Sequence, residues 1–253
     1  MPFRAGSRHV YPPTRPRCAV RQSRKSRRQR SARSLAMKGI DLNGVRHAVI
    51  VAPHSDDETI AAFHLICALR RRGARVDIVV VTDGSASHRN SASWPKPRLV
   101  AERRRETMRA MAMAGVPRDR IEFLGLPDGG LRSLDRRQIE TALVGLRQRP
   151  EPDLLIVPSV FDDHPDHRVV ARLCERAWPK CVKRLHYIVW PDRQNEARPS
   201  YCDLAIAGCP LRKRLVMRRY RTQTGIITDD PAGFSLMPPM LTRMCRSHEH
   251  FAS

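Results

Sequence analysis

Short runs of aliphatic and β-branched residues alternate with helical stretches from residue 45 onward, and this alternation constrains the fold more than any other feature. Such alternation is typical of βαβ units, in which helices cover both faces of a parallel sheet. It predicts strands over residues 47–52, 76–82, 121–124, 154–158 and 185–190. It predicts helices over residues 59–72, 99–114, 134–147, 167–178 and 209–220. We therefore expect an α/β fold, a three-layer α/β/α sandwich with a mostly parallel sheet.

The formal net charge of +22 is concentrated at the N-terminus. Residues 1–36 hold eleven arginine and lysine residues and no acidic residue. This segment has too few apolar residues to offset its ordering entropy, so residues 1–39 are predicted to form a disordered basic extension and 40–253 the folded domain. A polyanion-binding arm, a transit peptide and an upstream extension absent from the mature protein are all compatible with it, and Met37 before the first foldable sequence favours the last.

The rest of the composition excludes several classes of protein. Seven cysteines are scattered without a CxxC pair, which indicates reduced thiols, most of them buried, in a cytoplasmic protein. Nothing approaches a membrane span in length, and no secretory signal is present. An aromatic content of 5% and the lack of a nucleic-acid module argue against a specific nucleic-acid partner. The oligomeric state is not indicated.

Two polar clusters follow predicted strands and carry residues that bind metals. The first covers residues 53–58, Pro-His-Ser-Asp-Asp-Glu, and the second covers 162–167, Asp-Asp-His-Pro-Asp-His. Ligands of open parallel sheets bind beyond the carboxyl ends of the strands, so both clusters are expected at one crevice. A catalytic zinc site needs three imidazole or carboxylate ligands and one open position, which one histidine and one carboxylate of the first cluster and a histidine of the second would supply. Capping of the following helices is the alternative role for these residues.

The two clusters resemble the PHPDDE and HPDH signatures of the LmbE-like, or PIG-L, family of zinc-dependent N-deacetylases. Residues 81–84 (Val-Thr-Asp-Gly), Arg103 with Glu106, and residues 124–129 (Leu-Gly-Leu-Pro-Asp-Gly) also match family patterns in order and spacing. The resemblance covers about residues 45–225. It implies a Rossmann-like domain with its metal site at the C-terminal ends of the strands.

The resemblance also implies a role for each matched residue. One Zn²⁺ per chain would be bound by His54, Asp57 and His167. Asp56 would be the general base, and His164 would assist the tetrahedral intermediate. The remaining matches are Asp166, which would orient the neighbouring histidines, and Arg103 and Asp128, which would contact sugar hydroxyls.

Three positions need comment. Ser55 stands where the family usually has proline, which puts the rigidity of the turn in doubt. Asp162 stands where some sugar deacetylases carry a tyrosine that stabilises the oxyanion, so another residue would have that role here. His88 is expected at the surface, with a place in the pocket wall as the alternative.

The resulting hypothesis is hydrolysis of an N-acetylated sugar or glycoconjugate, a small-molecule substrate, with release of acetate. A same-fold hydrolase acting on a non-sugar amide, a non-acetyl amide or a thiol conjugate is an alternative. A polyanion-binding protein, using the N-terminus and the basic residues of 212–219, is a second one from another class. The loop 85–97 and the tail after Gly225 are expected to determine specificity.

Overall fold

The computed structural model describes residues 38–147, 150–191 and 202–253. The predicted disorder of residues 1–37 therefore lies outside the described residues. Lys38 and Gly39, which were predicted to belong to the extension, form strand β1 of the folded unit. The described chain thus begins two residues before the predicted domain boundary.

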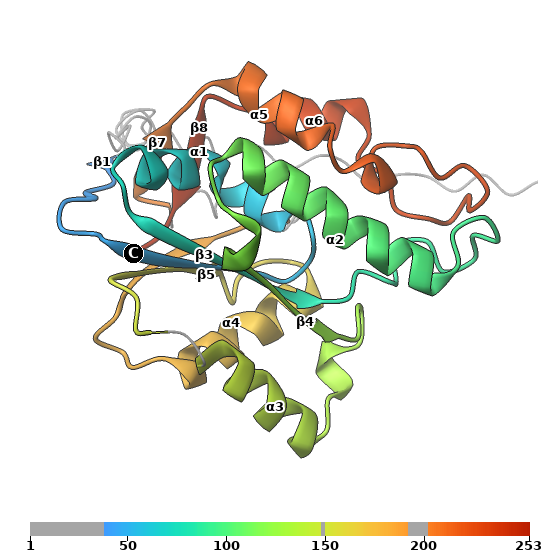
Figure 1. Cartoon of the computed structure of the whole chain (residues 1–253), viewed down its shortest axis with the longest axis horizontal. Coiled ribbons are helices and arrows are strands. Elements are labelled where there is room, and N and C mark those ends of the chain that lie inside the picture. Colours follow the sequence, from blue (N-terminus) through green and yellow to red (C-terminus); the bar gives the residue numbers. More distant parts are fainter. Residues whose placement is uncertain (1–37, 148–149, 192–201) are drawn as a thin grey trace, which may run out of the picture. The chain divides into compact units, whose positions relative to one another are not determined.

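A five-stranded parallel sheet forms the centre of the domain, as the sequence predicted (Figure 1). Its strands are β2 His47–Ala52, β3 Arg75–Thr82, β4 Ile121–Leu126, β5 Leu154–Pro158 and β6 Lys183–Tyr187, in the order β4-β3-β2-β5-β6. The chain moves outward from β2 through β3 to β4 and then returns to place β5 on the other side of β2. This reversal creates a crevice between the carboxyl ends of β2 and β5, where open α/β sheets bind ligands.

Helices cover both faces of this sheet. They are α1 Asp57–Arg71, α2 Lys96–Met113, α3 Arg136–Arg147, α4 Pro165–Ala177, α5 Pro210–Met217 and α6 Pro238–Met244. Figure 1 shows α3 and α4 on one face and α1, α2 and α5 on the other. The alternate residues of β2 point into two separate apolar clusters, Ala48 and Ile50 into one and Val49 and Val51 into the other. No described helix is both long enough and apolar enough to cross a membrane.

The C-terminal part of the chain forms a small second sheet that the sequence did not predict. Its order is β1 (Lys38–Gly39), β7 (Leu204–Ala207), β8 (His248–Phe251), with β8 antiparallel to β7. A bridge between His186 and Ala252 connects this part of the chain to the edge of the large sheet. Strands of two to four residues are too short to show an alternation of apolar and polar residues, which explains why they were missed.

The cysteines differ in part from the expectation. All six within the described residues are free, while Cys18 lies outside them. Only Cys67, Cys174 and Cys245 are buried, so the expectation that most of the thiols would be buried is met by half of those described.

An ion pair between Lys213 of α5 and Glu249 of β8 is buried against α1. Lys213 Nζ lies 2.7 Å from Glu249 Oε1 and donates a hydrogen bond to the Ile60 carbonyl, and Lys213 is only 1% exposed. The Glu249 carboxylate accepts hydrogen bonds from the backbone N–H groups of His64 and Leu65. Lys213, one of the basic residues of 212–219, therefore does not face solvent but holds three elements together.

We expect Glu249→Ala to lower the free energy of unfolding by about 3–5 kcal/mol, because it leaves the Lys213 ammonium buried without its partner. Urea denaturation measures the change. Glu140→Ala is the matched control, since the Glu140 side chain is 55% exposed and its ion pair with Arg176 is a surface pair. Equal losses in the two variants would contradict a structural role for the buried pair.

Candidate metal centre

The turns that follow β2 and β5 bring the two polar clusters together. Residues 53–56 lead from β2 into α1, and residues 159–164 lead from β5 into α4. His54 lies in the turn after β2, Asp57 is the first residue of α1, and His167 lies near the start of α4. Because β2 and β5 are neighbours in the sheet, these turns open at the same crevice. The structure therefore brings together the three residues predicted as metal ligands.

Three side-chain atoms of this group lie almost equally far from one another. His54 Nδ1 is 3.2 Å from Asp57 Oδ2, His167 Nε2 is 3.1 Å from the same oxygen, and the two ring nitrogens are 3.3 Å apart. In a tetrahedral zinc site with bonds of 2.0–2.1 Å, two ligand atoms are separated by about 3.3 Å. The three atoms thus have the spacing that a single tetrahedral ion requires.

Carboxylates behind the two histidines determine which ring nitrogen carries the proton. His54 Nε2 faces Asp128 Oδ1 at 3.2 Å and Asp166 Oδ2 at 3.5 Å. His167 Nδ1 faces Asp162 Oδ2 at 3.0 Å. A carboxylate next to one ring nitrogen favours the proton on that nitrogen and leaves a lone pair on the other. The lone pairs of His54 Nδ1 and His167 Nε2 consequently converge with Asp57 Oδ2, an arrangement that a cation satisfies.

Two other groupings of these residues could also hold a cation. The sets His54–His164–His167 and His54–Asp128–Asp166 each offer three ligand atoms that lie within 4.8 Å of one another. In the first set, His164 Nδ1 accepts the backbone N–H of Asp166. In the second, Asp166 accepts the N–H groups of Gly129 and Leu131. The tetrahedral spacing of His54, Asp57 and His167, together with their match to the family signatures, favours these three as the ligands.

Electrostatics also make this centre attractive to a cation. Burial lowers the pKa of His167, but Asp57 and Asp162 outweigh burial and raise it to about 9. Burial likewise lowers the pKa of His54, and the surrounding carboxylates raise it well above its ordinary value. Burial raises the pKa of Asp57, yet the two histidines hold it well below its usual range. The carboxylates around the two rings therefore stabilise positive charge at this point of the structure.

Asp56, the predicted general base, has an unusual backbone conformation. Its φ of 129° is the only positive value among the non-glycine residues that the structure describes. Such a conformation costs of order 1–3 kcal/mol and persists only where the surroundings enforce it. Glu58, which is fully buried, accepts the Asp56 N–H at 3.1 Å and is itself hydrogen-bonded by the Tyr220 hydroxyl. Glu58 and Tyr220 thus hold Asp56 in place, and the sequence analysis assigned neither of them to the site.

The Asp56 carboxylate lies in a pocket beside the metal-binding atoms. Burial raises its pKa well above the ordinary value, Arg103 opposes this shift, and the negative charges of Asp57 and Glu58 add to it. Arg103 Nη2 is 3.7 Å from Asp56 Oδ2. A buried carboxylate with a raised pKa is a better proton acceptor than an exposed one.

His164 lines the same pocket and caps the N-terminus of α4. Its Nδ1 accepts the backbone N–H of Asp166, so the neutral ring carries its proton on Nε2. Burial lowers the pKa of His164, and the charges of His54 and His167 lower it further. A neutral ring with a free N–H suits hydrogen-bond donation to an oxygen that becomes negative.

A cavity of about 350 Å³ opens above these groups. His54, Asp56, Asp57, Arg103, Asp128 and His164, all of them predicted as site residues, line it. The cavity is also lined by Ala86, Ser87, Gly129, Trp190, Gln223 and Phe234, which the sequence analysis did not single out.

Arg103 and Asp128 brace the site as well as line it. Arg103 donates to the carbonyl oxygens of Ser55 at 2.7 Å and Gly84 at 3.0 Å, and its side chain is 3% exposed. The hydrogen bond to Ser55 holds the turn that lacks the family's proline. Asp128 accepts the Ala86 N–H. Contact of either residue with substrate hydroxyls stays a prediction.

The structure contradicts the surface position expected for His88 and shows what Asp162 contacts. His88 is 3% exposed, so the expected surface position is incorrect, and it is not a lining residue of the cavity either. Asp162 is fully buried, and besides facing His167 it accepts the N–H groups of His164, Val189 and Trp190. The residue that replaces the family tyrosine therefore supports His167, a predicted metal ligand. The sequence could not show that Asp162, and not the adjacent Asp163, has this role, because the two residues are identical neighbours in the same cluster.

The α/β fold and the converging side chains at its strand ends are compatible with a metal-dependent enzyme. A family model described as PIG-L, GlcNAc-PI de-N-acetylase, matches residues 49–178, which is just over half of the 253 residues. The chain therefore belongs to the PIG-L family and is a metal-dependent N-deacetylase of N-acetylated sugars. No curated protein sequence matches the chain.

Solved structures with the same fold include enzymes with different reactions. One is N,N'-diacetylchitobiose deacetylase from Pyrococcus horikoshii, with 20% identity, a TM-score of 0.59 and 73% of each chain covered. Another is the teicoplanin deacetylase Orf2, with 16% identity, a TM-score of 0.50, and 70% of this chain and 84% of that chain covered. A third is GalB, the 4-carboxy-2-hydroxymuconate hydratase of Pseudomonas putida KT2440, with 17% identity, a TM-score of 0.58, and coverage of 79% and 82%. At these identities the likeness shows the fold alone.

We expect Asp162→Asn to weaken zinc binding by about tenfold or more, because the neutral amide supports the His167 ring less strongly than a carboxylate does. Competition with a fluorescent zinc chelator measures the affinity. Asp163→Asn is the neighbouring control, since that side chain is 63% exposed and forms a surface pair with Arg168. Unchanged affinity in a folded Asp162→Asn protein would contradict the supporting role.

Proposed function

We propose that this protein removes the acetyl group from the nitrogen of an N-acetylated amino sugar or its glycoconjugate, with one Zn²⁺ per chain. The ligands would be His54 Nδ1, Asp57 Oδ2 and His167 Nε2. The observation that supports this proposal most strongly is the mutual spacing of these three atoms, 3.1–3.3 Å, at the edge of a cavity. When bound, zinc lowers the pKa of a coordinated water and polarises a carbonyl group.

Asp56 is the residue placed to receive the proton of the attacking water. It lines the cavity, is held by Glu58, and has a raised pKa because it is buried. The water oxygen then forms a bond with the acetyl carbon, while its proton goes to an Asp56 carboxylate oxygen. The same proton can later pass to the departing nitrogen, so that acetate and a free amine are released.

His164 is placed to stabilise the oxygen that becomes negative during this attack. Its Nε2–H is the free donor of a neutral ring that lines the cavity. Asp166 fixes this ring through its backbone N–H and faces His54 through its carboxylate. Arg103 and Asp128 lie where sugar hydroxyls would reach the cavity wall, and we propose that Asp128 accepts a hydrogen bond from one of them.

The free cysteines of the described residues support the cytoplasm as the compartment.

We expect Asp56→Asn to lower kcat by about 10²- to 10⁴-fold while zinc content stays near one per chain, because the amide accepts no proton but leaves the ligand atoms in place. Acetate release from a panel of N-acetyl sugars and metal analysis of the same samples measure both quantities. Loss of zinc in this variant would show that Asp56, and not Asp57, is the ligand.

We expect His54→Ala and His167→Ala each to lose both zinc and acetate release, since two protein ligands retain zinc poorly. His47→Ala is a control of the same chemical kind, because His47 lies at the start of β2 and contacts Asp77. Full zinc occupancy in both ligand variants would remove the proposed site. A parent protein that carries zinc but releases no acetate from any sugar would redirect the search to other substrates.

A further inference from the structure

One wall of the cavity comes from residues beyond the part of the chain that the family model matches. The match ends at residue 178, whereas Trp190, Gln223 and Phe234 follow it in the sequence. Trp190 follows β6, Gln223 lies in the short turn after α5, and Phe234 lies in the segment before α6. This wall is therefore formed by the C-terminal part of the chain, which the family model does not match.

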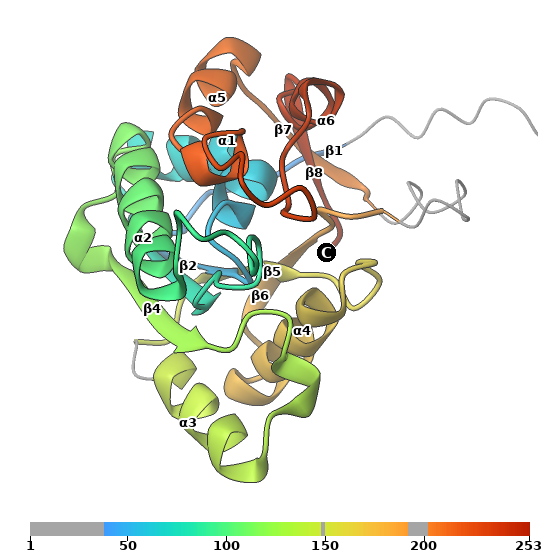
Figure 2. The ribbon, with the colours of Figure 1, turned by 90° about the vertical axis from the view of Figure 1, so that its right-hand side faces the viewer.

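Hydrogen bonds join the segment 229–234 to the long loop after β3, residues 83–95. We call this junction the clasp. Phe234 N–H donates to Ser87 O at 2.7 Å, and the Asp230 carboxylate accepts Asn90 N–H at 2.9 Å. Asp229 accepts both the Ser91 hydroxyl and the Ser93 N–H. Figures 1 and 2 both show the two segments side by side. The two regions that the sequence analysis expected to determine specificity are thus joined into one structure.

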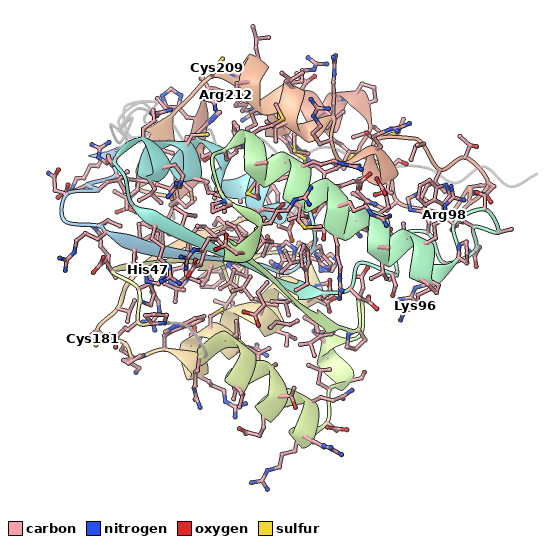
Figure 3. All side chains as sticks on the ribbon, viewed as in Figure 1. His47, Lys96, Arg98, Cys181, Cys209 and Arg212 are labelled. Carbon is pink, nitrogen blue, oxygen red and sulfur yellow. The ribbon has the colours of Figure 1, made fainter. Side chains whose placement is uncertain are left out.

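The outer end of this clasp is held by the first residues of α2. Lys96, labelled in Figure 3, pairs with Asp83 at 3.0 Å. Arg98 donates to Ser93 O, and its guanidinium lies 4.1 Å from the centre of the Trp94 ring. The loop is therefore fixed at both ends, although it contains no helix or strand.

Close packing of Gly233 against the His88 ring also supports the clasp. An added Cβ at Gly233 would lie 2.3 Å from His88 Cδ2 and 3.0 Å from Asp230 O. Only glycine permits this approach, and the passage of the chain over the His88 ring buries that histidine. His88 thus has a place in the fold, under the segment that carries Phe234.

The metal centre positions the other aromatic residue of the wall. Asp162, which faces His167, accepts the Trp190 N–H at 3.2 Å, and the Trp190 carbonyl accepts Asp163 N–H at 2.8 Å. The rings of Trp190 and Phe234 then meet edge to face, with centroids 5.8 Å apart and planes at 86°. Both rings pack on the core yet stay partly exposed at the cavity, which a purely structural role does not require.

Two perpendicular rings form an apolar corner, while Asp128 and Arg103 supply charged groups elsewhere in the same cavity. A flat sugar ring needs one aromatic face, whereas a corner encloses a bulkier apolar group from two sides. We propose that this corner binds an apolar aglycone, an alkyl or aryl group attached to the N-acetylated sugar, and that Trp190 and Phe234 determine specificity for it. The inference rests on the proposed function and names the substrate class.

The test compares N-acetylglucosamine with its phenyl β-glycoside as substrates of the zinc-loaded full-length protein. We expect kcat/KM for the phenyl glycoside to be about tenfold higher or more in the parent. Phe234→Ala should reduce this ratio to about two or less, with most of the loss in kcat/KM for the phenyl glycoside. Phe234→Tyr keeps the ring and should keep the ratio. Leu211→Ala, an exposed apolar side chain on α5 that does not line the cavity, is the control and should keep it too.

The possible results separate the two proposals. Equal kcat/KM for both sugars in the parent, or a ratio that survives Phe234→Ala, overturns the aglycone site but leaves the deacetylase proposal standing. A preference for longer N-acyl chains on the free sugar that disappears in Phe234→Ala also overturns it, since the corner would then bind the acyl group. If the zinc-loaded parent hydrolyses neither sugar, the proposed function is overturned, and the proposed substrate class falls with it.

Discussion

The structure of this site depends on the convergence of three lone pairs where β2 and β5 end. His54 Nδ1, Asp57 Oδ2 and His167 Nε2 approach one another to 3.1–3.3 Å. The surrounding carboxylates raise the pKa of both histidines, so the buried crevice stabilises positive charge, carried by protons or by a metal ion. Neighbouring parallel strands make the convergence possible, since their following turns open on the same side of the sheet.

A ring of carboxylates around this point gives each neighbouring group its role. Asp162 and the Asp128–Asp166 pair face the outer nitrogens of the two histidines and direct their inner nitrogens to the cation. Glu58 accepts a hydrogen bond from the Asp56 N–H and so stabilises the strained backbone conformation of Asp56. Asp162 also fixes the backbone of Trp190. The proposed metal binding, proton transfer and substrate wall would consequently be supported by the same few buried side chains.

The sequence predicted the parts that are encoded locally. The period of apolar residues predicted the five strands of the large sheet and helices α1 to α5, but not the short α6, and the resemblance to the family signatures predicted that His54, Asp57 and His167 lie together. Contributions from distant, irregular segments could not be predicted. Tyr220 and Phe234 carry no motif, and only the folded chain brings them to Glu58 and to the cavity. The burial of Lys213 was missed because its partner, Glu249, lies on a strand of four residues.

The most direct test of the central claim is a crystal structure of the zinc-loaded protein with anomalous diffraction recorded on both sides of the zinc absorption edge. The account predicts one strong anomalous peak within about 2.0–2.2 Å of His54 Nδ1, Asp57 Oδ2 and His167 Nε2, with a position open to the cavity. A zinc ion held by His164 or by Asp128 and Asp166 in place of these atoms, or no zinc in the crevice, would contradict it.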